Sequence, residues 1–222
     1  MKSATDLRIR ATAVAALCAA VAAAACRRGG ETPPPAATHV NSSTGEVAQY
    51  SLMKDAVGWL TDSNIVDLAT IVNQAPVRLA RVESQQSTDQ AVHAFALEVI
   101  RDHTVLQTSL DSLAGKRRIP SQRPAVAESI QAPYDSTLAT LTATPIQQME
   151  QQYLSAERTV VARSLTDFSA LAGNASDPDL RALLVSRAVG MEQRHLARAT
   201  QLAASLAQAD SAKQATRSER KS

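Results

Sequence analysis

Apolar residues recur every three or four positions from residue 62 onward, which is the spacing of one face of an α-helix. The pattern predicts a first helix over residues 62–83, with Asp62 and Ser63 as the N-cap candidates. Pro76 falls inside this stripe. Because proline removes a helical hydrogen bond, we expect the first helix to kink or break there.

Capping and breaking residues predict where the later helices begin and end. A long second helix is expected over residues 89–114, behind Ser87 and Thr88 and in front of Gly115. A shorter helix is expected over residues 126–141.

Two further helices follow in the same way. Thr144, with Pro145 at the first helical position, opens a long helix that should end at residue 172, before a Gly-Asn pair. Asp177 and Pro178 are likewise a capping residue followed by proline, and they begin a last helix that runs to about residue 207. Three long helices, one interrupted helix and short connections predict an all-α antiparallel four-helix bundle with an extra short helix.

The N-terminal region has the composition of an export signal. Residues 1–10 carry three cations and one anion, and residues 11–26 are almost unbroken Ala, Val and Leu. This apolar run is shorter than the roughly twenty residues that span a bilayer, so we expect cleavage rather than insertion. The predicted organisation is a signal segment at 1–26, a disordered tether at 27–50, the bundle at 51–208 and a polar tail at 209–222.

Cys26 ends the apolar run, and the sequence Ala-Ala-Ala-Cys there resembles a bacterial lipobox. In that motif the cysteine receives the lipid, so we expect attachment at Cys26 and a lipid-anchored protein of the periplasm or outer membrane. The motif prefers leucine at the position of Ala23. The alternative is cleavage by ordinary signal peptidase, which accepts small residues and would release a secreted soluble protein.

Charge excludes one class of partner. Apart from the ionic residues of the leader, the chain has equal numbers of basic and acidic residues. A nucleic-acid-binding protein needs a basic face, and aromatic residues that could stack on bases make up only 3% of the chain. We therefore expect no nucleic-acid partner; a membrane, reached through the lipid, and an envelope protein remain as partners.

His103 and His195 are the residues most suited to chemistry. Each lies in register with the apolar stripe of a long helix, and Glu192 precedes His195 by three residues, which puts both on one helix face. A shared site of His103, His195 and Glu192 would suit Zn, Fe or Cu. Asp102 points about 100° away from His103, so Glu192 is the carboxylate expected near either ring. The alternative is that both histidines are structural core residues, each hydrogen-bonded to a neighbouring carboxylate.

Several segments together resemble a bacterial ferritin-like family, whose members are mostly predicted outer-membrane or secreted proteins with a domain of unknown function. The resemblance covers residues 64–206. It rests on FALEVIRDHT at 95–104, on Gly115 with Ile119-Pro120, on DPDL at 177–180 and on HLARA at 195–199. It implies a ferritin-like bundle.

The family pattern also implies a glutamate early in the first helix and a histidine in the third. These positions fall on Pro76 and Val161 here, so two of the four inward polar positions are apolar. Glu83 and Glu157 are the carboxylates that could compensate for the loss.

Two main functions remain open on the sequence, beside a lipid-surface role that would need an exposed apolar patch. One is a non-enzymatic envelope module that binds a partner or has a structural role. The other is a metal-binding or metal-dependent redox protein that uses the inward histidines. A single shared ion is sensible if the two rings lie within about 5 Å of each other beside a carboxylate, and not beyond about 8 Å.

Overall fold

The computed structural model describes residues 60–220 of the 222-residue chain. The expected leader with Cys26 and the expected tether lie outside the described residues. Every regular element in the described part is helical. In chain order these elements are α2 (Asp62–Gln86), α3 (Gln90–Arg117), α4 (Ala127–Thr142), the 3₁₀ turn η1 (Ile146–Gln148), α5 (Met149–Asn174), α6 (Pro178–Leu183), the π-helical turn η2 (Leu184–Val189) and α7 (Gly190–Glu219).

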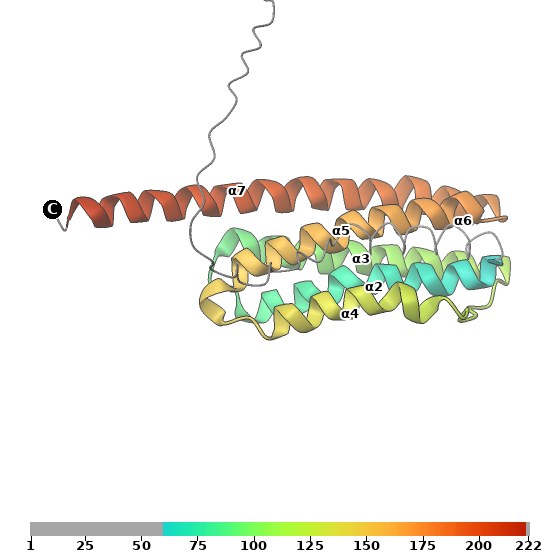
Figure 1. Cartoon of the computed structure of the whole chain (residues 1–222). Coiled ribbons are helices and arrows are strands. Elements are labelled where there is room, and N and C mark those ends of the chain that lie inside the picture. Colours follow the sequence, from blue (N-terminus) through green and yellow to red (C-terminus); the bar gives the residue numbers. More distant parts are fainter. Residues whose placement is uncertain (1–59, 221–222) are drawn as a thin grey trace, which may run out of the picture. The chain divides into compact units, whose positions relative to one another are not determined.

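The helices form an antiparallel bundle, as the sequence predicts. The chain reverses direction between α2 and α3, between α3 and α4, between α4 and α5 and between α5 and α7 (Figure 1). Because α4 lies between them in the chain, α3 and α5 run in the same direction. Helix α2 packs against α3, α4 and α5, while α7 packs against α5 and α3. The shorter α4 is the extra helix on the α2–α5 side. No helix in the range 60–220 has an apolar stretch long enough to cross a bilayer.

Leucine, isoleucine, valine and alanine from all the long helices fill the core, and eight polar or charged side chains are buried among them. Burying such groups is costly unless they are paired, so each of them calls for an explanation. The eight are Asn73, Glu83, His103, Glu157, Ser164, Asp167, Glu192 and His195.

Of the kink or break expected at Pro76, the break is wrong, because α2 runs without interruption from Asp62 to Gln86. Pro76 is itself buried, and the apolar stripe on both sides of it, including Val72 and Leu79, stays in the core. An internal proline costs a helix about 3 kcal/mol. Tertiary packing of a continuous apolar face is the main source of helix stability in proteins, and here it outweighs that local cost.

The helix ends differ by a few residues from the predicted ones. Thr61 caps α2, in place of Asp62 or Ser63, and forms a reciprocal capping box with Asn64. Asp89 caps α3 through the amides of Ala91 and Val92, in place of Ser87 and Thr88. In each case the cap is the residue whose side chain reaches the free amides of the first turn.

Gly115 lies inside the last turn of α3 and does not end the helix. Arg118 takes the left-handed position, with φ 58°, and the amides of Arg118 and Ile119 bond the carbonyls of Gly115 and Ala114. This is a Schellman ending with arginine where glycine is usual.

The last two helices also differ from their predictions. Pro145 precedes the 3₁₀ turn η1, and α5 itself begins only at Met149. At the other end of the chain, α7 continues to Glu219, well beyond residue 207, although its side chains are almost all exposed after Leu206. Alanine and other good helix formers in this segment extend the helix without burial.

Candidate metal centre

Helices α3 and α7 bring the three predicted ligands together in the core. His103 comes from α3, and Glu192 and His195 lie one turn apart on α7; all three are almost completely buried. The two imidazole rings are 5.3 Å apart between centroids. One ligand atom from each of the three residues lies within 4.8 Å of the other two. The predicted cluster therefore exists as a single group of side chains.

A chain of hydrogen bonds fixes the protonation of His103. The carboxylate of Asp111 can only accept, so the Gln107 amide nitrogen donates to it at 2.8 Å. The Gln107 oxygen then accepts from Asn73 Nδ2 at 3.0 Å, and Nδ2 also donates to the His103 carbonyl. Asn73 Oδ1 is left facing His103 Nδ1 at 2.9 Å, so Nδ1 must carry the proton and donate. The lone pair of His103 is therefore on Nε2.

His195 is oriented by a carboxylate from the neighbouring helix. Its Nε2 lies 3.3 Å from Asp102 Oδ2. Burial acts to raise the pKa of Asp102, but hydrogen bonds from Arg101 and His195 lower it overall, so this carboxylate is ionised and accepts. His195 Nε2 is thus the protonated nitrogen, and its lone pair is on Nδ1.

Both lone-pair nitrogens are buried without a hydrogen-bond partner among the described residues. These are His103 Nε2 and His195 Nδ1, and the two oxygens of Glu192 are in the same condition. Burial and the neighbouring His195 lower the pKa of His103 to about 3, and burial also lowers the pKa of His195. Both rings are therefore neutral at neutral pH, which is the form that binds metals.

Glu192 is placed to act as the acidic ligand. Its Oε1 lies 3.9 Å from His103 Nε2, too long for a hydrogen bond. Because that separation is shorter than the sum of two metal–ligand bonds of about 2.0–2.2 Å each, one ion can bind both atoms with a bent angle at the metal. Burial raises the pKa of Glu192 well above its usual range, and the nearby Glu157 raises it further. Without a cation, this carboxyl group is stable in the core only in its protonated form.

The sequence alone did not identify two residues that support the centre. Asp102 points away from His103 on its own helix, yet the same 100° offset turns it toward His195 on α7. Asn73 lies on α2, and nothing in its local sequence marks it as the partner of a histidine thirty residues away. Glu192 contacts His103, and Asp102 is the carboxylate at His195.

The two family positions that are apolar here are indeed packed in the core, with Pro76 in α2 and Val161 in α5. Glu157 is fully buried near Glu192, and burial raises its pKa to about 8. Glu83 lies farther along α2, where burial raises its pKa to about 7 and its electrostatic neighbours include Glu150. Of the two proposed replacements, only Glu157 acts electrostatically on a residue of the centre.

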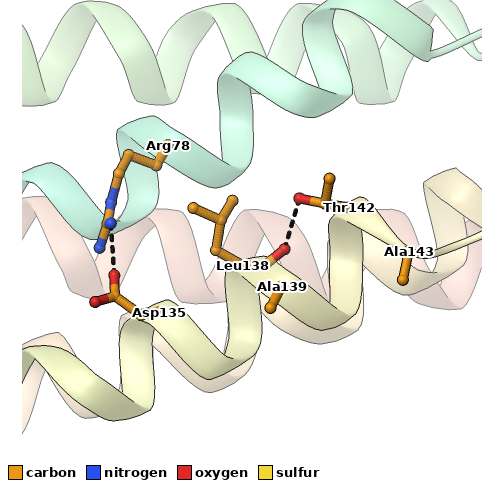
Figure 2. A pocket seen from close by; sticks show the side chains of 6 residues that line it. All are labelled: Arg78, Asp135, Leu138, Ala139, Thr142 and Ala143. Atoms are coloured by element: carbon orange, nitrogen blue, oxygen red, sulfur yellow. Dashed lines mark hydrogen bonds and ion pairs between the residues drawn. The ribbon is translucent and has the colours of Figure 1, made fainter.

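A shallow groove between α2 and α4 is a separate feature of the surface (Figure 2). Its charged residues are Arg78 and Asp135, which pair with each other at 2.6 Å across one end. Leu138 and Ala139 form part of its lining, and Thr142 bonds the Leu138 carbonyl within α4. Since its two charged residues neutralise each other, the groove offers less chemistry than the centre between α3 and α7.

Fold and site together define an all-α helical-bundle protein with a buried histidine–carboxylate cluster. The chain belongs to a family described as "Domain of unknown function (DUF4142)", whose profile matches residues 47–202. No curated protein matches the chain.

A solved structure supports the fold. The chain is similar to a crystal structure of a DUF305 fragment from Deinococcus radiodurans, with a TM-score of 0.53 and 15% sequence identity. The match covers 64% of this chain and 95% of that one. At this identity the likeness concerns the fold alone, and it agrees with the expected all-α helical bundle.

Proposed function

We propose that this protein binds one transition-metal ion inside the bundle, with His103, His195 and Glu192 as ligands. The observation that carries the proposal is the set of buried acceptor atoms. Two neutral imidazole nitrogens and a carboxylate converge within 4.8 Å, and no described hydrogen-bond donor satisfies them. Structural core histidines normally have their polar atoms paired, whereas metal ligands have outer partners and a free inner lone pair.

Charge balance supports a cation at this place. Glu192 and Glu157 are both fully buried, and each can lose its proton in the core only if a positive charge compensates. The mixed nitrogen and oxygen ligands suit Zn, Fe or Cu. The cluster is closed to solvent, which favours a metal-binding role over catalysis, because catalytic metal sites keep a position open to substrate.

Elemental analysis of the purified protein tests this function. We expect about one metal ion per chain in the wild type and none in a His103→Ala, His195→Ala double variant. Asn64→Ala, which alters the distant cap of α2, is a control that should retain the ion. If the wild type contains no metal and takes none up from Zn²⁺, Fe²⁺ or Cu²⁺ solutions, the two histidines are structural residues and the proposal is wrong.

We also propose that the bundle works in the bacterial envelope, held at a membrane by a lipid on Cys26. The support is the sequence of the leader: a basic start, an apolar run of about sixteen residues and a small-residue motif before the cysteine. In this view the protein is a non-enzymatic envelope module, and an envelope protein is its expected macromolecular partner.

Membrane fractionation of a Cys26→Ser variant tests the anchor. We expect the variant to move from the membrane pellet to the soluble fraction, since diacylation together with N-acylation supplies the attachment. Cys18→Ser is the matched control and should stay in the pellet. A Cys26→Ser protein that pellets as firmly as the wild type contradicts the lipid anchor.

A further inference from the structure

A second group of potential ligands adjoins the buried centre on its solvent side. Glu98 and Asp102 lie one turn apart on α3, and each has a carboxylate oxygen within 4.8 Å of the other and of a nitrogen of His195. Both acidic residues are accessible to solvent, whereas His195 is 2% exposed. His195 is thus shared between an outer group and the buried one.

The shared histidine distinguishes this group from an ordinary acidic patch. His195 Nε2 faces Asp102, while its Nδ1 is buried without a described hydrogen-bond partner and is available to the inner group. The other members of the inner group, His103 and Glu192, are both 0% exposed. A cation that reaches them must pass some side chain at the surface, and the ring of His195 touches both environments.

We propose that Glu98, Asp102 and His195 form a loading site, where a divalent transition-metal ion is first captured before it moves inward to His103 and Glu192. This inference rests on the proposed metal-binding function. The carboxylates attract the hydrated ion, and His195 binds it through Nε2, the nitrogen that faces Asp102. For this the ring changes to its other neutral tautomer, in which Nε2 gives up its proton and Nδ1 takes one up; the reverse change frees Nδ1 for the inner site, so no proton is gained or lost overall. A neutral imidazole has one lone pair, so His195 serves one site at a time, and the chain holds one ion at saturation.

Two arginines set the electrostatics of the loading site. Arg101 donates to Asp102 Oδ1 through two nitrogens, at 2.9 and 3.0 Å, and so competes with an arriving cation. Arg194, one residue before His195, adds a positive charge that acts on the His195 ring. Removing Glu98 should therefore slow capture, and removing the charge of Arg101 should speed it.

Rates of Zn²⁺ loading and release, measured by stopped flow with the metal-free full-length protein, test the proposal. Clustered charge of one sign can raise association rates by roughly tenfold or more. We expect Glu98→Gln to slow association and dissociation by a similar factor of about three to ten, with an unchanged equilibrium Kd. Arg101→Gln should accelerate loading. Glu128→Gln on α4 and Arg158→Gln on α5 are the charge-matched controls and should load as the wild type does.

The outcomes separate this proposal from the one on which it rests. A wild type that takes up no Zn²⁺ refutes both. If the wild type binds one ion but Glu98→Gln and Arg101→Gln load at the wild-type rate, only the loading site is refuted. A Glu98→Gln variant whose Kd weakens while its association rate is unchanged would make Glu98 a ligand of the final site, which also overturns the loading role.

Discussion

Two buried polar groups of this bundle differ in whether their acceptor atoms have hydrogen-bond donors. Between α4 and α5, the Tyr134 hydroxyl donates to Asp167 at 2.6 Å, and Arg163 lies 3.8 Å from the same carboxylate and over the Tyr134 ring. Between α3 and α7, the inner atoms of His103, His195 and Glu192 are acceptors without described donors. In the first group the buried acceptor has a hydrogen-bond donor and a cation near it, whereas the acceptors of the second group need a proton or a metal ion.

The contrast shows what distinguishes the proposed ligand set from a polar group whose atoms pair within the same core. Burial is similar in both, so burial alone does not distinguish them. The direction of the hydrogen bonds does: donors face inward at Tyr134, but at the histidines the donors face outward, to Asn73 and Asp102. Outer partners that fix an imidazole and leave its other nitrogen free are typical of metal ligands.

The largest expected effect is the stabilisation of the fold by a bound metal ion, and its absence would remove the difference between the two polar groups. At a free metal concentration 1,000 times its Kd, a bound ion should stabilise the fold by about 4 kcal/mol. Thermal melts with and without EDTA measure this. His195→Leu should abolish the EDTA effect, while the metal-free fold changes by no more than about 1.5 kcal/mol. An unchanged wild-type Tm on adding EDTA would contradict metal binding.

A smaller effect concerns Glu157 in the metal-free protein. Its folded pKa of about 8 lies above the unfolded value of 4.5, so its contribution to stability falls as pH rises from about 4.5 through 8. Between pH 5 and pH 8 this should cost the wild type roughly 3–4 kcal/mol of unfolding free energy, a loss that Glu157→Gln should not show. Urea unfolding at both pH values provides the measurement. Parallel pH profiles for the two proteins would show that Glu157 is not held protonated by the fold.

The next effect tests the outer partner of His103. Asn73→Leu removes the acceptor at His103 Nδ1 while keeping the size of the side chain. Loss of such a partner typically weakens metal binding by about 10- to 100-fold. Competition with a chelator of known affinity measures the Kd. Thr70→Val is the neighbouring control. It removes an acceptor of Gln107 Nε2 but leaves the hydrogen bonds from Gln107 through Asn73 to His103 in place, so it should change the Kd less. Equal affinities in Asn73→Leu and the wild type would show that the partner does not tune the site.

The smallest effect tests the other polar group, which contains Tyr134 and Asp167. Tyr134→Phe removes the donor to Asp167 and should destabilise the protein by about 1–3 kcal/mol, because a buried acceptor loses its partner. Metal content should remain that of the wild type. Denaturant unfolding and elemental analysis on the same preparation report both quantities. A loss of metal in this variant would mean that the two polar groups are coupled through the core.

The helical periodicity of the sequence predicted the residues of the buried site and most of the helices. The apolar stripes of α3 and α7 already placed His103, His195 and Glu192 inward, and the structure brings all three together. Helix ends were harder, because Thr61 and Asp89 compete with equally suitable neighbours, and only the folded chain decides which side chain reaches the free amides. The break expected at Pro76 is wrong for a related reason: the local cost of the proline is visible in the sequence, but the packing that outweighs this cost is not.

The sequence by itself determined the helices and the angle at which each side chain leaves its helix, since 3.6 residues per turn fix that angle without reference to neighbours. Only the tertiary structure decided which side chains meet. That Asp102 reaches His195, that Asn73 reaches His103 and that Glu157 lies near Glu192 all depend on how α2, α3, α5 and α7 pack. Helix packing distances and rotations arise from many side chains together, so no local pattern records them.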